Sequence, residues 1–597
     1  MSGIAGIVHF RGEAPDRDQV QQLSTGIAHR GPHDKAILAE GAAAIAFRRF
    51  STRRHQPDQL LSAGALWLAF DGPLFSGTGE DLLERWSAVG PRCLESISGE
   101  FALVVWDKQR RVLWLVRDAT GSRPMFWTRR GGRVAFCSEL PPLLRLPWVS
   151  RELAVDHLAE YLSFRYVHAP RTLLHDISAV PPGHLLRIDA SGEHLERWWR
   201  PPWSKPDAEI QDEKRVIDHL DRLLGQSVER RIQGDVPVGL LLSGGLDSSA
   251  ILHHAVKHTP DLPTFTVALS EGSTDESPFA ARVARVMGAP HHLIRVSDRQ
   301  FIDALTGATE AMGQPLPTAA GAVQKRLFSE IRRSVRVILS GDGGDEILGG
   351  RGMDRIAWRL KKSLLVGRLP GPVRLLTRKV ARRARLNDWS ASPAEFGMNR
   401  AIGGSRVFHS AERVTLLADP GMVRPGIRRT VLEPMYQEVD SSPLNNILHV
   451  WQRGWLPEDG LARSDRMAAS SGLEVRYPML DTELLIFTSG LPDGVKVHRR
   501  RTQYVTKWLL RQAMADRLPR PLLHRPKRSL PNPLNLWLRE PGADFLSDQV
   551  EAICDQDADL FVPAVVQRLA AEHRSGEGNH GLRLWTLILF HIWRAGL

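Results

Sequence analysis

Two short loops in this chain combine small residues, hydroxyls and carboxylates, and each follows an apolar segment. The first loop is Ser243-Gly244-Gly245-Leu246-Asp247-Ser248, directly after residues 238–242. The second is Ser340-Gly341-Asp342-Gly343-Gly344-Asp345, directly after residues 335–339. Small residues let backbone N–H groups converge on an anion, and the start of a following helix adds its positive end. Either loop alone is a weak signal, but the pair strongly indicates a phosphate-binding site.

The apolar segments before these loops predict the elements that position them. Residues 238–242, 264–268, 292–296 and 335–339 read as buried strands that alternate with helical patterns. This alternation predicts a parallel sheet with crossover helices, whose ligands bind at the carboxyl ends of the strands. Asp247 and Asp345 would then face each other there, and paired carboxylates with phosphate oxygens suit Mg²⁺.

The amino-terminal half has a different pattern. Residues 2–188 predict short strands separated by turns, for example at 65–70, 101–106 and 112–116, with few helices. The Pro-rich stretch 197–206 breaks both periodicities and predicts a linker. We therefore expect two domains, at residues 1–200 and 209–597, the second becoming mainly helical after about Leu348.

Composition is that of an ordinary soluble protein, with 42% hydrophobic and 24% charged residues over 597 positions. The three cysteines match no metal-ligand spacing, which favours a reducing compartment. No secretion signal or apolar run of about 18 residues occurs, so we expect a cytoplasmic protein without a transmembrane segment.

The net charge of +12 is concentrated in one region. Residues 355–388 contain eleven Lys or Arg against one acid, with apolar residues interleaved. This pattern fits a solvated helical face, or a surface for a nucleic acid, a membrane or an acidic peptide. No nucleic-acid-binding motif accompanies it, so we do not predict a nucleic-acid partner.

The whole chain resembles the asparagine synthetase B superfamily, and its first loop resembles the pyrophosphate loop of N-type ATP pyrophosphatases. Besides the two loops, the matching segments are 274–277, 465–467, 473–481, 507–511 and 525–528. The resemblance implies an α/β two-domain fold. A degenerate Ntn-type glutaminase αββα sandwich would precede an adenine nucleotide α-hydrolase-like synthetase domain with a parallel sheet and a helical C-terminal part.

The resemblance also implies ATP and Mg²⁺ as cofactors and a two-step reaction. A substrate carboxylate attacks the α-phosphate of ATP to give an acyl-adenylate and pyrophosphate, and an amine then displaces AMP to form an amide. Adenine would contact Leu241 and Val267, and Ser340 and Gly341 would line the nucleotide. Pyrophosphate would be held by the first loop, through Ser243, Gly244, Gly245, Asp247 and Ser248, and the metal by Asp247 and Asp345.

Three further residues receive catalytic roles from the resemblance. Lys527 would stabilise charge on the α-phosphate and on the tetrahedral intermediate. Asp342 and Glu474 would orient or deprotonate the amine, since an ammonium has no lone pair. Alternatives remain open, because Glu474 could form a structural ion pair with Arg476 and Lys527 could lie on the surface.

The amino terminus departs from the family pattern. The family nucleophile is a cysteine exposed by removal of the initiator methionine, whereas this chain has Ser2. The family Asn-Gly that builds the oxyanion hole reads Asp71-Gly72, and a carboxylate there would repel an oxyanion. We predict a domain that folds but does not hydrolyse glutamine. A serine-type nucleophile, or an introduced serine, is the alternative.

A synthetase without an ammonia supply needs another amine. β-Lactam synthetases and lasso-peptide macrolactam cyclases fit that description, because an amine of the same substrate attacks with a large effective molarity. We favour a lasso-peptide cyclase, with a precursor peptide and its leader peptidase as partners. The alternatives are another small-molecule carboxylate substrate, asparagine synthesis from aspartate and ammonia, and a catalytically inactive scaffold. The segment 314–318 is expected near the acceptor pocket.

Overall fold

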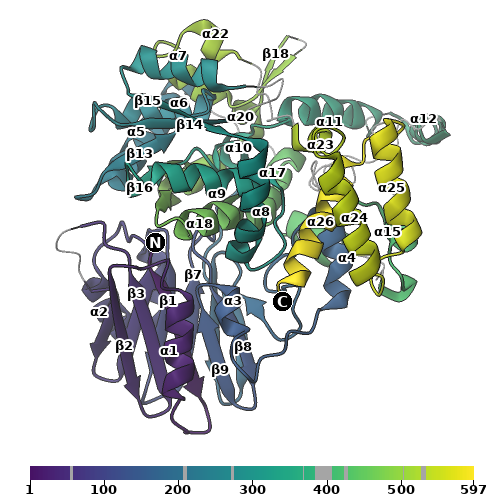
Figure 1. Cartoon of the computed structure of the whole chain (residues 1–597). Helices are drawn as coiled ribbons and strands as arrows, with labels where there is room; N and C mark the ends of the chain where they lie inside the picture. Colours follow the sequence, from purple (N-terminus) through teal and green to yellow (C-terminus); the bar gives the residue numbers. More distant parts are fainter. Residues whose placement is uncertain are drawn as a thin grey trace.

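The amino-terminal part is a sandwich of two antiparallel six-stranded sheets (Figure 1). The computed structural model describes residues 1–53, 58–205, 212–269, 275–367, 369–383, 407–422, 428–501, 503–525 and 533–597. One sheet has the order β10 (Ser178–Ala179), β8 (Phe126–Arg130), β9 (Arg133–Cys137), β1 (Gly3–His9), β3 (Ala43–Arg49), β2 (Asp34–Glu40). The other has the order β12 (Gly192–Arg197), β11 (His184–Asp189), β7 (Val112–Arg117), β6 (Ala102–Asp107), β5 (Leu66–Asp71), β4 (Leu60–Ala63).

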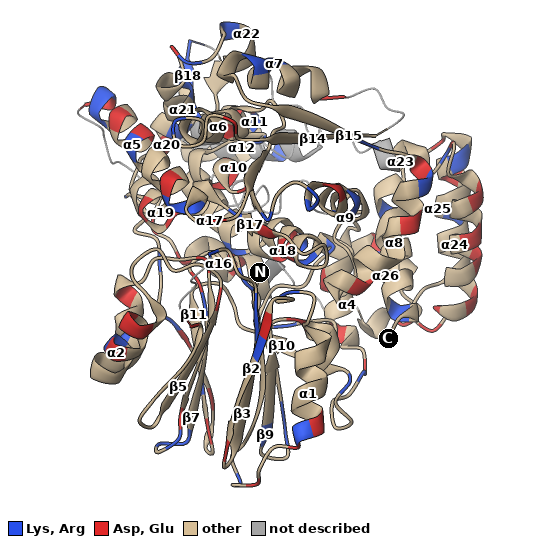
Figure 2. Ribbon diagram, turned by 60° about the vertical axis from the view of Figure 1, so that its left-hand side comes forward, with Lys and Arg blue, Asp and Glu red and all other residues tan. Residues whose placement is uncertain are grey.

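Alternating apolar residues explain why the two sheets stack. Ile45 and Phe47 of β3 point into the same buried core as Val104 and Trp106 of β6, two residues apart in each strand. Helix α1 (Arg17–Gly26) covers the outside of the first sheet, and α2 (Gly79–Val89) covers the second. Figure 2 shows the two sheets edge-on between these helices. The result is the predicted αββα sandwich.

The second part is built on a five-stranded parallel sheet. Its order is β15 (His291–Val296), β14 (Thr264–Leu269), β13 (Val238–Leu241), β16 (Val337–Leu339), β17 (Glu474–Arg476). Helices before and between the strands are α5 (Glu213–Ile232), α6 (Leu246–Ala255), α7 (Ser277–Met287), α8 (Asp298–Met312) and α9 (Ala320–Ile331). Parallel strands need such crossovers, as the sequence pattern predicted.

Most of the chain beyond the second loop is helical, as expected. The helices used below are α10 (Gly344–Leu348), α11 (Met353–Gly367), α12 (Gly371–Arg383), α17 (Pro443–Arg453), α18 (Ala462–Ala469), α20 (Asp493–Lys496) and α21 (Trp508–Ala513). Within the parallel sheet, sequence reasoning missed strand β17, because three residues with two charges carry no strand pattern. Within the described ranges, no helix combines the length and the apolar character needed to cross a bilayer.

A buried set of charges joins the sandwich to the synthetase part. We call it the interdomain ion network, and its members are Arg30, Asp71, Glu100, Arg123, Glu139, Arg231, Asp465 and Asp481. Arg30 is fully buried and lies 3.0 Å from Asp71, 3.2 Å from Glu139 and 2.8 Å from Asp465. Buried charges persist only when they are paired in this way.

Because of this network, we expect the stability of the fold to decrease at acidic pH. Burial alone would raise the pKa of Glu139, but His29 and Arg30 outweigh it and lower the pKa from 4.5 to about 2. A lowered pKa gives stability that is present above the unfolded-state value and is lost as the pH falls towards 2. Glu139 therefore contributes up to about 3 kcal/mol at neutral pH.

We predict that the free energy of unfolding falls between about pH 5 and pH 2. Glu139→Gln should be less stable at pH 7 and should lose less over this range, because glutamine has no carboxyl group to protonate. Urea unfolding followed by circular dichroism at several pH values measures both effects. Glu193→Gln is the matched control, since Glu193 pairs with Arg129 at the surface. An acid dependence in Glu139→Gln as steep as in the unsubstituted protein would contradict the prediction.

Candidate active site

Both loops lie where the strand order of the parallel sheet reverses. From β13 the chain continues outward to β14 and β15, and then returns to β16 on the other side of β13. The first loop follows β13 and the second follows β16, so they leave neighbouring strands in opposite directions. Ligands of open α/β sheets bind at the carboxyl ends of the strands at this switch point.

The first loop is shaped by glycine and by its own hydroxyls. Gly244 has a φ of +68°, and a Cβ atom there would lie 2.6 Å from the backbone nitrogen of Ala280. The backbone N–H of Gly245 donates to Ser243 Oγ at 3.2 Å, and the Oγ atoms of Ser243 and Ser248 lie 3.2 Å apart. Helix α6 begins one residue after Gly245, which gives the loop an anion-binding helix start.

The two loops touch each other. A Cβ atom on Gly344 would lie 2.6 Å from the carboxylate of Asp247, and one on Gly341 would lie 3.3 Å from the backbone nitrogen of Ser248. Only a residue without a side chain fits such a close approach at Gly344. The structure therefore brings together the predicted residues of both loops.

Lys507 joins the two aspartates. Its Nζ forms an ion pair with Asp247 Oδ2 and lies 2.6 Å from Asp345 Oδ1. Burial opposes the charged form, but the two carboxylates outweigh it and raise the pKa of Lys507. Asp247 Oδ1 is buried and accepts no hydrogen bond from any residue that the structure describes. Sequence reasoning matched the segment 507–511 to the family but gave Lys507 no role.

The two positions that the sequence predicts to contact adenine lie on neighbouring strands of this sheet. Leu241, the last residue of β13, pairs with Phe265, and Val267 is two residues further along β14. Because side chains alternate along a strand, Leu241 and Val267 share one face of the sheet. Both are partly buried.

Asp342 is anchored in the second loop. The hydroxyls of Ser340 and Ser464 lie 2.8 Å and 3.4 Å from Asp342 Oδ2, and both donate to it. Ser464 belongs to α18, which follows the second loop by more than a hundred residues in the sequence. The backbone N–H of Ser340 also donates to the carbonyl oxygen of Arg476 in β17.

The remaining catalytic predictions lie apart from the loops. Glu474 begins β17 and pairs with Val337, at the end of the sheet opposite the second loop. Its Oε1 accepts from Arg476 Nε at 2.7 Å, as in the ion-pair alternative. Burial would raise the pKa of Glu474, but Arg476 outweighs it and lowers the pKa to about 2. Lys527 lies outside the described residues.

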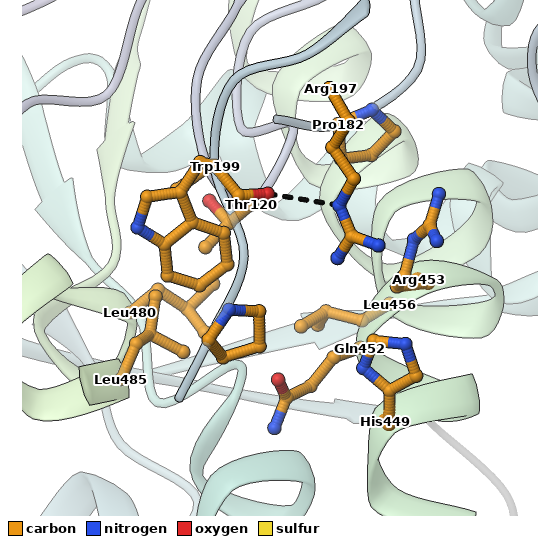
Figure 3. A pocket seen from close by; sticks show the side chains of 12 residues that line it. Thr120, Pro182, Arg197, Trp199, His449, Gln452, Arg453, Leu456, Leu480 and Leu485 are labelled. Atoms are coloured by element: carbon orange, nitrogen blue, oxygen red, sulfur yellow. Dashed lines mark hydrogen bonds between the residues drawn. The ribbon is translucent and has the colours of Figure 1, made fainter. Parts of the chain in front are cut away.

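One cavity in the described part of the chain is lined mainly by residues of the sandwich, of the segment 197–201 and of α17, and by no residue of either loop (Figure 3). It offers about 20 Å³, enough for a water molecule but not for a nucleotide. Gln452 lines it and donates to the carbonyl oxygen of Glu346, next to Asp345. Figure 3 shows Arg197 and Arg453 on the same side of this cavity.

At the expected nucleophile position of the sandwich, Ser2 and Asp71 are hydrogen-bonded to other residues of the same domain. Ser2 is buried, and its Oγ accepts from the backbone N–H of Phe50 at 3.1 Å and donates to Gln59 Oε1 at 3.3 Å. Neither partner removes a proton at neutral pH. Asp71 accepts from Arg30 Nη2 at 3.0 Å, and burial raises the pKa of Asp71.

Comparison with known proteins adds to this geometry. The family model "Asparagine synthase" matches residues 219–595. The chain belongs to the asparagine synthase family. A second model, "Glutamine amidotransferase domain", matches residues 76–199 and so begins after Ser2 and Asp71. The family identifies the chain as an ATP-dependent carbon–nitrogen ligase.

Relatives resemble this synthase family member along most of its length. A Mycobacterium tuberculosis protein whose name assigns it to the glutamine-hydrolyzing asparagine synthetases is 30% identical, covering 96% of this chain and 93% of its own. Asparagine synthetase 1 of Bacillus subtilis, also named as glutamine-hydrolyzing, is 26% identical, covering 100% and 96%. A Gibberella zeae protein named amidase chry2 is 23% identical, covering 79% and 75%.

We predict that Gly344→Ala weakens binding of Mg·ATP at least tenfold, because the added Cβ pushes against the carboxylate of Asp247. Isothermal titration calorimetry measures the affinity. Gly494→Ala, also in the synthetase part but with open space around the new Cβ, should bind as the unsubstituted protein does. Equal affinity in both variants would contradict the close contact of the loops.

Proposed function

We propose that the two loops bind Mg·ATP and that the chain uses it to close an amide within one peptide substrate, as a macrolactam cyclase. The observation that carries the proposal is the convergence of Asp247 and Asp345 on one ammonium at the sheet switch point. Ser243, Gly244, Gly245 and Ser248 are the proposed pyrophosphate contacts. The substrate carboxylate becomes an acyl-adenylate, and the amine then displaces AMP.

A magnesium ion fits the donors of this site. Among the residues that the structure describes, no three His, Cys, Asp or Glu side chains gather into a metal site of their own. Asp247 and Asp345 would therefore hold the ion together with phosphate oxygens, and the buried Oδ1 of Asp247 is an available oxygen ligand. Mg²⁺ supplies charge neutralisation of the leaving pyrophosphate when bound. Lys507 keeps the two carboxylates together.

The remaining roles combine the positions of the described groups with the roles that the family resemblance implies. Leu241 and Val267 offer an apolar face for adenine, and Ser340 and Gly341 border the nucleotide from the second loop. Asp342 is proposed to orient the attacking amine, since Ser340 and Ser464 fix its carboxylate. Lys527 is proposed to stabilise charge on the α-phosphate. Glu474, with a pKa near 2, suits holding an ammonium better than removing its proton.

The sandwich supports an amine source other than glutamine. Arg30 binds the Asp71 carboxylate in the region where the family places an amide donor, and neither of the partners that the structure describes for the Ser2 hydroxyl, Gln59 and the backbone of Phe50, is a base. An amine on the substrate itself replaces released ammonia through its large effective molarity.

The basic region 355–388 supports a peptide substrate. Its described part forms α11 and α12, where Trp358, Leu365, Leu375 and Leu376 are exposed. Lys362 Nζ lies 3.3 Å from the centre of the Trp358 ring. Exposed apolar side chains among cations suit an acidic, partly apolar peptide segment, such as that of a precursor bound before or after leader cleavage.

Asparagine synthesis is the second candidate function. It is favoured by the names of the relatives, which cover nearly the whole chain. Under this alternative the same loops adenylylate aspartate, and free ammonia attacks.

We predict that the chain with ATP and Mg²⁺ yields AMP, pyrophosphate and a dehydrated product from synthetic peptides that carry a free amino terminus and one internal Asp or Glu. Mass spectrometry and a pyrophosphate assay measure this. Lys527→Ala should abolish amide formation, whereas Lys214→Ala, at an exposed position of α5, should not. Asparagine formed from aspartate and ammonium, without peptide dehydration, would favour the second candidate. No AMP under either condition would overturn both.

We also predict that neither the unsubstituted chain nor Ser2→Cys releases glutamate from glutamine. A thiol restores the nucleophile but leaves Asp71 paired with Arg30, where an oxyanion needs a neutral donor. A coupled glutamate assay measures the rate. Glutamate release by Ser2→Cys would show that the nucleophile was the only defect.

A further inference from the structure

The interdomain ion network reaches the second loop of the synthetase part by two routes. In the first, Arg30 donates to both oxygens of Asp465, at 2.8 Å and 3.2 Å. Asp465 follows Ser464 in α18, and Ser464 donates to Asp342. A residue of the sandwich is therefore separated from the proposed amine-orienting carboxylate by one ion pair, one peptide unit and one hydrogen bond.

The second route runs through β17. Arg123 Nη2 donates to the carbonyl oxygen of Val475 at 3.1 Å, and the next carbonyl, that of Arg476, accepts from the backbone N–H of Ser340. Arg123 also lies 3.4 Å from Asp465. The two routes share Asp465 and end on the same loop.

We propose that Arg30 is a positioning residue of the synthetase reaction, acting through Asp465 on the loop that carries Ser340 and Asp342. The inference deepens the proposed function and rests on it, since this loop is half of the proposed nucleotide site. The amidotransferase-like domain thereby serves as a rigid support for the synthetase site. Its role is to position the second loop, and not to deliver ammonia.

Burial makes the ion pair between Arg30 and Asp465 rigid. Arg30, Asp465 and Asp71 are all at most 1% exposed. Burial would raise the pKa of Asp465, but Arg30 outweighs it and holds the pKa of this carboxyl well below its usual range. The bidentate geometry fixes the orientation of the carboxylate as well as its charge. Helix α18 cannot shift without breaking these bonds in a place that water does not reach.

The contact between Arg30 and Asp465 is also specific to arginine. A lysine keeps the positive charge but cannot donate to both oxygens of Asp465 while it also holds Asp71 and Glu139. Arg30→Lys should therefore have a smaller effect than Arg30→Ala, and in the same direction. Arg30→Ala leaves three buried carboxylates with less compensation, and it is used only if it folds.

The experiment follows the loop directly, by hydrogen–deuterium exchange of residues 340–346 in the full-length chain. Arg30→Lys and Ser464→Ala should each raise the exchange rate of these amides several-fold and weaken Mg·ATP binding about tenfold. The double variant should be no worse than the more affected single variant, because both substitutions interrupt one route. Arg129→Lys, in a surface ion pair of the same domain, is the control and should change neither quantity.

The outcomes separate this inference from the proposed function. Unchanged loop exchange and unchanged Mg·ATP affinity in Arg30→Lys would overturn the inference, even if the melting temperature falls. Additive losses in the double variant would also overturn it, because Arg30 and Ser464 would then act independently. Failure of the unsubstituted chain to bind Mg·ATP would overturn the proposed function, while loop exchange would still test the support of the second loop by Arg30.

Discussion

The nucleotide half of this molecule depends on keeping two aspartates together. Two carboxylates in contact with the same cation repel each other by about 3 kcal/mol at an effective dielectric constant of about 20. Lys507 offsets this repulsion, and the structure holds it in place with a left-handed backbone, at a φ of +52°, directly before α21. A non-glycine residue in that conformation is strained, which is typical of functional sites. The position of the ammonium is therefore fixed by the fold and not by the loops alone.

The same arrangement bears on the proposed binding of Mg·ATP. In the structure, the ammonium of Lys507 compensates the charges of Asp247 and Asp345. In the proposed complex, the same carboxylates would gain a divalent ion as a second cation, and the ammonium of Lys507 would gain phosphate oxygens as partners. The added positive charge of the divalent ion would offset part of the added negative charge of the phosphates. Buried charges are tolerated only under such balance.

The sequence predicts the loops and the sheet that carries them because their signals are local. Apolar runs ending in Ser, Gly and Asp mark strands β13 and β16, and the observed strands match within two residues. Lys507, β17 and the contact between Arg30 and Asp465 were not predictable in the same way. The role of Lys507 and the ion pair of Arg30 with Asp465 each depend on a contact between segments that are distant in the sequence. Strand β17 is buried although two of its three residues are charged, so its sequence gives no strand signal. The segments 465–467, 473–481 and 507–511 were matched to a family, but such a match does not say which residue each side chain contacts.

The unusual carboxylate at position 71 and the interdomain contact belong to one charge balance. The guanidinium of Arg30 forms an ion pair with Asp465 of the synthetase part. In the sandwich, Asp71 Oδ2 lies 3.0 Å from Arg30 Nη2 and forms a second ion pair with it. An amide at position 71, as the family pattern has it, would donate hydrogen bonds without compensating a buried guanidinium. The carboxylate that is unsuited to an oxyanion is thus well suited to anchoring Arg30. The predicted lack of glutamine chemistry and the docking of the two domains would then follow from the same carboxylate. This gives a physical reason for an amidotransferase-like domain in a ligase that we propose takes its amine from elsewhere.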